Sequence, residues 1–166
     1  DVEEWYSPSL TVNHVSSMTN DGKPSIMIGN CCLSCSFQES NCLGEALLRK
    51  NNNAGAAAYF GGSDYTYWDE DFYWSVGVRT VINANMNPTY DANHLGMYDR
   101  LFHTHGEAYS DWYTCAGALN MSGNMAVQSS NSALKNYYWE VYHLMGDPSL
   151  LPWLGEASDM TVSCSP

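Results

Sequence analysis

The sequence has few basic residues: only six Lys and Arg stand against 18 Asp and Glu in 166 residues, a formal net charge of −12. Proteins that bind nucleic acids neutralise phosphates with basic side chains, so this composition argues against a nucleic-acid partner. The sequence also lacks any apolar run near the ~20 residues needed to cross a bilayer. We therefore expect neither nucleic-acid binding nor a transmembrane segment.

The sequence has enough hydrophobic residues for one folded domain. Of its 166 residues, 45% are hydrophobic, which is typical of a globular protein. The acidity is typical of a secreted or cell-surface protein, of a cation-binding protein, or of a subunit that meets a basic surface, and composition does not choose among these. The polar segment 155–166 is expected to be a tail or the start of a following β domain.

The cysteines are unevenly spaced. Four of the six lie within twelve residues, whereas small disulfide scaffolds space their cysteines more evenly. Cys32, Cys35 and Cys42 are compatible with part of a zinc site, but a matching downstream pair of ligands is missing. A metal-binding domain built on this cluster is therefore the weaker interpretation. The six are Cys31, Cys32, Cys35, Cys42, Cys115 and Cys164.

The pair Cys31-Cys32 follows a short apolar run at residues 25–28 and precedes small polar residues. Such a run predicts a strand that delivers the next side chain to the carboxyl edge of a sheet, where α/β proteins build their sites. A thiol there can act as a nucleophile if a partner, normally a histidine, ionises it, because a free cysteine has a pKa of roughly 8.5. Along an extended segment only one of the two side chains faces the cleft, and alternation does not say which.

The following segments predict an α/β fold. Residues 42–50 have apolar positions at helical spacing, and residues 56–60 form a second apolar run. Strand, helix and strand make a βαβ unit with parallel pairing and a right-handed crossover. Further helices are expected at 69–81, 96–109, 111–121 and 132–144, an edge strand at 149–153, and a loop at 83–91.

Four blocks go beyond this general pattern: Gly-Asn-Cys-Cys-Leu at 29–33, Cys-Leu-Gly-Glu-Ala at 42–46, the aromatic and acidic block 67–77, and 137–149. In this order and at these distances they resemble the gingipain family of cysteine endopeptidases, relatives of caspases and legumain. The resemblance implies a secreted or cell-surface peptidase with a Cys-His dyad that cleaves peptides or proteins. It also implies a caspase-like three-layer α/β/α sandwich with a mostly parallel sheet, of which residues 1–154 would be the C-terminal part of the catalytic domain.

The resemblance assigns roles to individual residues. Cys32 matches the nucleophile, and its backbone N–H matches one donor of the oxyanion hole, so Cys31 would point back into the packing. Trp68, preceded by Tyr67, matches the aromatic wall of the pocket that binds the P1 side chain of the substrate. The family often has Gly after this Trp, whereas this chain has Asp69, so the shape or charge of the pocket rim is expected to differ.

The catalytic histidine is expected outside the chain. In the family it belongs to a His-Gly pair a little over thirty residues before the nucleophile, which places it just upstream of Asp1. We therefore expect an upstream polypeptide that completes the catalytic domain. The internal His105-Gly106 pair follows the nucleophile and is expected at a helix end, and His14 lacks a following Gly. His143 is expected in a helix, as a core residue or behind the site.

Two alternatives to a peptidase are a catalytically inactive gingipain-like module used for binding or assembly and, as the weaker one, the metal-binding domain on the cysteine cluster. No cofactor is expected to be required. Asp69, Glu70 and Asp71 are compatible with a structural Ca²⁺ ion, but acidic residues in the first turn of a helix need no ion, because the helix dipole favours them.

Overall fold

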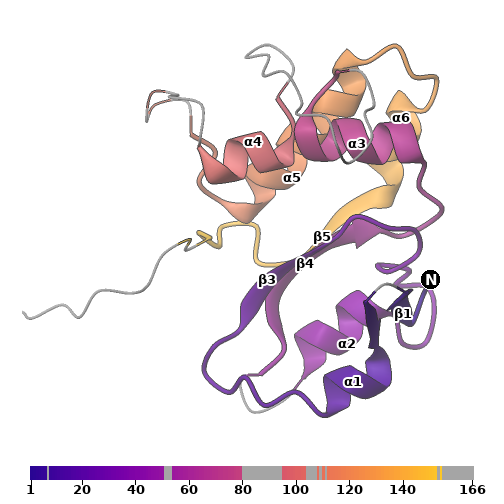
Figure 1. The fold of residues 1–166 in the computed structure, drawn as a ribbon, viewed down its shortest axis with the longest axis vertical. Coiled ribbons are helices and arrows are strands. Elements are labelled where there is room, and N and C mark those ends of the chain that lie inside the picture. Colours follow the sequence, from indigo (N-terminus) through magenta and orange to yellow (C-terminus); the bar gives the residue numbers. More distant parts are fainter. Residues whose placement is uncertain are drawn as a thin grey trace, which may run out of the picture.

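The computed structural model describes residues 1–6, 8–50, 54–79, 95–103, 108, 110, 112–152 and 154. Within these ranges a three-stranded sheet lies between two layers of helices (Figure 1). Its strands are β3 (Ser25–Gly29), β4 (Ala56–Gly62) and β5 (Tyr142–Gly146), in the order β3-β4-β5, and a separate hairpin consists of β1 (Glu4–Tyr6) and β2 (Ser9–Thr11). The helices are α1 (Val12–Ser16), α2 (Leu43–Arg49), α3 (Trp68–Val76), α4 (Met97–Phe102), α5 (Ala116–Ser129) and α6 (Lys135–Val141).

The predicted βαβ unit is confirmed. Strands β3 and β4 are parallel, and α2 connects them within residues 25–62. Helices α1 and α2 cover one face of the sheet and α3 to α6 the other (Figure 1), so the expected α/β/α layering is also confirmed. Strand β4 is buried along almost its whole length, as its continuous apolar sequence indicates for a central strand covered on both faces.

Neighbouring residues of β4 supply the two cores, because successive side chains of a strand point to opposite faces. Phe60 packs with Trp74 and Tyr142 under α3 to α6, and Tyr59 packs with Leu43 and other apolar residues of α2 on the other face. All five side chains are at most 1% exposed. The end of β3 is therefore held between two packed layers.

One predicted helix is wrong at its C-terminal end. A helix was expected over 132–144, but α6 ends at Val141 and the chain continues directly into β5. Strand β5 pairs antiparallel with β4, with Tyr142 opposite Gly62 and Leu144 opposite Phe60. Pairing with the free edge of β4 satisfies backbone groups that a longer helix would have bonded internally. The sheet is consequently mixed in the described part of the chain.

Other element boundaries also differ from the expectation. Helix α4 ends at Phe102, because His103 adopts a left-handed conformation, and α5 begins later and runs further than expected. Residues 149–152 form no strand, and Leu150 instead accepts a hydrogen bond from the N–H of Ala116 at the start of α5. The expected loop at 83–91, the pair at 105–106 and the tail at 155–166 lie outside the described residues.

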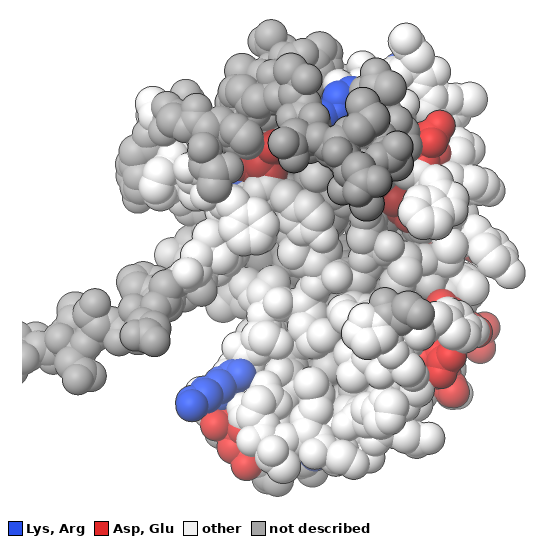
Figure 2. All heavy atoms as spheres, viewed as in Figure 1, with Lys and Arg blue, Asp and Glu red and all other residues white. Residues whose placement is uncertain are grey.

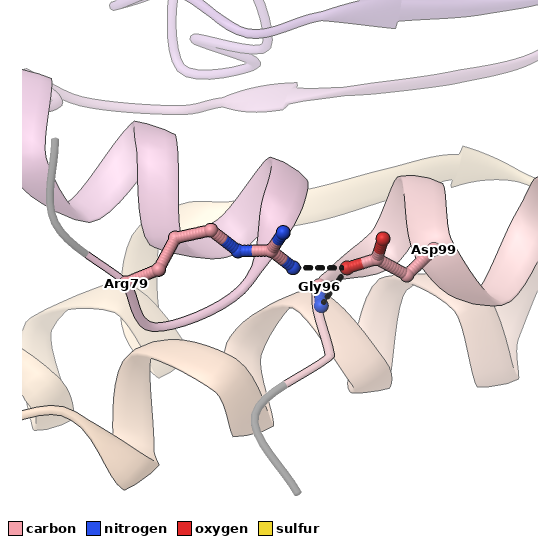
Figure 3. A network of polar contacts seen from close by, with 3 residues as sticks. All are labelled: Arg79, Gly96 and Asp99. Atoms are coloured by element: carbon pink, nitrogen blue, oxygen red, sulfur yellow. Dashed lines mark hydrogen bonds and ion pairs between the residues drawn. The ribbon is translucent and has the colours of Figure 1, made fainter. Parts of the chain in front are cut away.

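A buried ion pair fixes the end of the α3 region to the start of α4 (Figure 3). Arg79 Nη2 lies 3.0 Å from Asp99 Oδ2, and each side chain is only 9% exposed. The N–H of Gly96 donates to the same oxygen at 3.1 Å, which closes the first turn of α4. Two segments that are far apart in sequence are thereby joined by charge-assisted hydrogen bonds.

Charged side chains are sparse on the face drawn in Figure 2, and acidic atoms gather at the edge where Figure 1 places the N-terminus. A hollow of about 440 Å³ there is lined by residues that include Asp1, Glu3, Glu4 and Glu39.

Among the described helices, none combines the length and apolar character needed to span a membrane.

Candidate active site

The cysteine pair lies in a turn at the carboxyl end of β3. The N–H of Leu33 donates to the carbonyl of Asp64 at 3.1 Å, and that of Cys35 donates to the carbonyl of Gly62 at 2.9 Å. These bonds attach the turn to the segment after β4. They also hold Leu33 at φ 64°, a left-handed conformation that costs of order 1 kcal/mol for a residue other than glycine and is found preferentially at functional sites.

The extended geometry expected for Cys31 and Cys32 is wrong, because both belong to this turn. Alternation therefore does not separate them, and both residues line the same pocket. Burial raises the pKa of Cys31, which keeps this thiol protonated and weakens it as a nucleophile. Cys31 is partly buried, and the expectation that its side chain points back into the packing stays a prediction.

Cys32 is surrounded by polar groups of Thr66. Its Sγ lies 3.3 Å from the N–H donor of Thr66 and 3.5 Å from both the carbonyl oxygen and the hydroxyl oxygen of that residue. Within the described part of the chain, the backbone N–H of Cys32 has no hydrogen-bond acceptor. This N–H is therefore available to a substrate, as an oxyanion-hole donor has to be.

A pocket of about 680 Å³ opens beside Cys32. One face of α3 forms its wall, because residues at positions i, i+3, i+4, i+7 and i+8 of a helix share a face. Trp68 begins this series and is 90% exposed, so it is a rim residue and not part of the core. The series is Trp68, Asp71, Phe72, Ser75 and Val76, and the other lining residues are Asp1, Tyr6, Asn30, Cys31, Cys32, Thr66 and Tyr98.

Asp71 is the only acidic side chain of α3 that lines this pocket. Its carboxylate accepts hydrogen bonds from the hydroxyls of Thr66 at 2.7 Å and Tyr138 at 2.9 Å. Burial raises the pKa of Asp71 to about 6, although both hydrogen bonds act in the opposite direction. At pH 7 the pocket therefore holds a mostly ionised carboxylate among apolar side chains, an arrangement that suits a cationic ligand.

The structure brings together only part of the predicted site. Cys32 and Trp68 line one pocket, whereas Tyr67 and Asp69 do not line it and are exposed. The ring of Tyr67 packs instead on Tyr137, with centroids 6.2 Å apart. Asp71 was missed as a pocket residue: its spacing of three from Trp68 places both on one face of the helix, but spacing does not show that this face lines the pocket.

His14 and His143 are among the described histidines, and neither lines the pocket beside Cys32. His14 caps α1, where its Nδ1 accepts the N–H of Thr11 at 3.2 Å. His143 lies in β5 and not in the expected helix, its ring is 5.4 Å from that of Phe37, and burial lowers its pKa. Within the described part of the chain, Cys32 makes no hydrogen bond to a histidine.

The metal hypotheses gain no support from the arrangement of side chains. Among the described residues, no three His, Cys, Asp or Glu gather as a group that could hold a metal ion. The acidic residues of α3 diverge: Glu70 accepts a hydrogen bond from Ser132, and Asp71 accepts from Thr66 and Tyr138. The carboxylates of Glu70 and Asp71 therefore bind different partners and do not converge on one site.

Fold and site together define an α/β protein with a cysteine turn at the carboxyl edge of its sheet and a pocket beside the thiol. The family model of Peptidase family C25 matches residues 2–153. The chain belongs to this family.

The relatives extend well beyond this chain. Lys-gingipain of Porphyromonas gingivalis strain ATCC 33277 is 36% identical over 156 residues, which are 90% of this chain and 8% of the relative. Lys-gingipain W83 of the same organism is 35% identical with the same coverage. The chain therefore spans only a small part of these relatives.

Two solved structures share the fold. One, described as "Structure of Protease", has a TM-score of 0.77 and 32% identity over 92% of this chain and 33% of that one. The Arg specific cysteine proteinase gingipain R has a TM-score of 0.69 and 19% identity over 92% of this chain and 31% of that one. At that identity the second likeness is one of fold alone.

Proposed function

We propose that this chain contributes the nucleophile and the P1 pocket of a cysteine endopeptidase that cleaves after basic residues, above all lysine. The observation that supports this function best is the common pocket of Cys32, Trp68 and Asp71. A nucleophile, an aromatic wall and a carboxylate lie there around one space. Family membership supports the reaction class.

Hydrolysis would proceed through an acyl-enzyme. The thiolate of Cys32 attacks the scissile carbonyl carbon, and the negative charge that develops on the carbonyl oxygen is stabilised by the N–H of Cys32. A histidine supplied from outside this chain takes the thiol proton and gives it to the leaving amine. Water then attacks the thioester, and the acid product is released with Cys32 regenerated.

A basic P1 side chain fits the pocket chemically. Its aliphatic stem would lie along Phe72 and Val76, and its cationic end would pair with Asp71, while the Trp68 ring offers a cation–π partner at the mouth. The relatives named Lys-gingipain support lysine as the preferred residue. The adjacent hollow with Asp1, Glu3, Glu4 and Glu39 would favour the approach of basic peptides.

The catalytic domain would be completed by an upstream polypeptide that supplies the histidine and the second oxyanion donor. Strand β3 pairs only with β4 among the described strands, so its other edge is open to a further strand. Residues 1–154 would form the C-terminal part of that domain, and 155–166 a tail or the start of another. We further propose a secreted or cell-surface location and no required cofactor, with Ca²⁺ at most structural.

The experiment is a cleavage-site map. The assembled catalytic domain, containing this chain and its upstream polypeptide, is incubated with a denatured protein mixture, and the new termini are identified by mass spectrometry. We expect Lys, and to a lesser degree Arg, before the cleaved bond. Cleavage after neutral residues would contradict the basic pocket, and absence of cleavage in a domain that carries the histidine would favour the inactive module.

A further inference from the structure

The segment 65–67, which connects β4 to α3, is held from behind by two adjacent tyrosines of α6. The hydroxyl of Tyr137 donates to the carbonyl of Tyr65 at 2.8 Å. The hydroxyl oxygen of Tyr138 accepts the N–H of Tyr67 at 2.9 Å and also lies 3.1 Å from the carbonyl of Tyr67. The backbone on both sides of Thr66 is therefore fixed, and the position of Thr66 relative to the cysteine turn is fixed with it.

Thr66 lies between the nucleophile and the pocket acid. Its N–H points to Cys32 Sγ at 3.3 Å, and its hydroxyl oxygen is 3.5 Å from the same sulfur and 2.7 Å from Asp71 Oδ2. The side chain is almost completely buried, with Thr66 9% exposed, so solvent competes little for its hydroxyl. One residue thus contacts both chemical groups of the site.

The hydroxyl of Thr66 has one proton and two possible acceptors. When Asp71 is ionised and unpaired, the carboxylate takes that proton, because it is the nearer and stronger acceptor, and the hydroxyl can then offer only a lone pair to the sulfur. That orientation favours the protonated thiol. When a cation neutralises Asp71, the hold on the hydroxyl weakens, and its proton can turn towards the thiolate of Cys32.

We propose that Thr66 is a positioning residue that couples occupation of the P1 pocket to ionisation of Cys32. A cation on Asp71 frees the Thr66 hydroxyl to donate to the Cys32 thiolate, so that the nucleophile is activated when a matching substrate is bound. This inference rests on the proposed function, since it takes Asp71 as the group that meets the basic side chain. It adds to that function that binding of a basic side chain in the P1 pocket promotes ionisation of the nucleophile.

Other titratable groups surround this link. They are Asp1 at the N-terminus, Cys31 from the turn, Glu70 from α3, Tyr137 and Tyr138 from α6, and Tyr142 from β5. The pKa values of Cys31 and of the three tyrosines are raised by burial, which keeps these groups neutral. By contrast, burial raises the pKa of Asp71 to about 6, so its charge changes between pH 5 and 7.

The test measures thiol reactivity and needs no turnover. In the assembled catalytic domain, the rate of Cys32 alkylation by iodoacetamide is followed against pH, with and without n-butylammonium, which mimics a lysine side chain. For the wild type we expect n-butylammonium to speed alkylation roughly three- to tenfold at pH 7, the scale of the net free energy of one hydrogen bond. Binding of n-butylammonium is measured separately by competition with a lysyl substrate.

Three variants isolate the hydroxyl. Thr66→Ser keeps the proton donor and should keep the acceleration, whereas Thr66→Val and Thr66→Ala lack the donor and should lose most of it while still binding n-butylammonium. The direct electrostatic effect of the cation on the sulfur is common to all the proteins, so the difference between serine and valine reports the hydroxyl alone. Thr66→Ala serves if the valine variant fails to fold.

Equal acceleration in the serine, valine and alanine variants would overturn the coupling and leave the proposed peptidase function intact. A wild-type domain that binds n-butylammonium without faster alkylation would overturn it in the same way. Failure of the wild type to bind n-butylammonium would overturn both the coupling and the basic P1 pocket. These outcomes separate the inference from the function on which it rests.

Discussion

Cys32→Ala is expected to abolish turnover in the assembled catalytic domain, lowering kcat by about 10⁴-fold or more, because burial keeps the neighbouring Cys31 thiol protonated and unable to replace the lost nucleophile. The fold should survive, since the Cys32 side chain is only partly buried and its hydrogen bonds all go to Thr66. The measurements are hydrolysis of a lysyl amide substrate and the thermal unfolding midpoint.

Cys31→Ser is the matched control for this variant. Cys31 lines the same pocket one residue earlier, but burial raises the pKa of its thiol, so we expect it to play no part in the attack. Activity of the control should stay within about tenfold of the wild type, the scale of a small packing change beside a site. Loss of activity in Cys31→Ser together with retention in Cys32→Ala would reverse the assignment.

Asp71→Asn is expected to lower kcat/KM for lysyl substrates by about 10²- to 10³-fold, because it removes the buried carboxylate that we propose pairs with the substrate ammonium group. A substrate with a neutral P1 residue should be affected far less. Asp69→Asn is the control, since Asp69 carries the same charge on the same helix but is exposed and does not line the pocket. Equal losses in both variants would mean that only the overall charge matters.

In the wild type, the pairing of Asp71 with a lysyl substrate should make kcat/KM for that substrate depend on pH. The pKa of Asp71 is raised to about 6, so the carboxylate loses its charge as the pH falls through that value. The ratio of kcat/KM for lysyl over neutral substrates should therefore fall between about pH 7 and pH 5. In Asp71→Asn this ratio should be low and independent of pH, and a ratio that still titrates there would assign the effect to another group.

The sequence predicted the βαβ unit because each of its elements has a clear local pattern. The apolar run of β4 is continuous, as expected for a central strand, and α2 has both helical spacing and a basic end. Strand β5 could not be found in this way. Its aromatic and apolar residues suit helix and strand equally, and only the free edge of β4 decides between them.

The resemblance predicted the site residues that match the family by position. It did not predict residues whose place in the pocket depends on how the helices pack. Cys32 and Trp68 came from matching positions, but Asp71 was interpreted as one of three acids that stabilise a helix N-terminus. The three acidic side chains of α3 point in different directions. Asp69 is exposed, Glu70 accepts a hydrogen bond from Ser132, and Asp71 lines the pocket. The contact of Thr66 with Cys32 joins residues 34 apart and has no local signal in the sequence.

The most direct measurement of the central claim is the position of a covalent label. The assembled catalytic domain is treated with a peptidyl chloromethyl ketone that carries lysine at P1, digested, and mapped by tandem mass spectrometry, with the norleucine analogue as the neutral control. We expect the lysyl reagent to modify Cys32 alone and far faster than the norleucine reagent. Modification of Cys31, or equal labelling by both reagents, would contradict a Cys32 nucleophile beside an acidic P1 pocket.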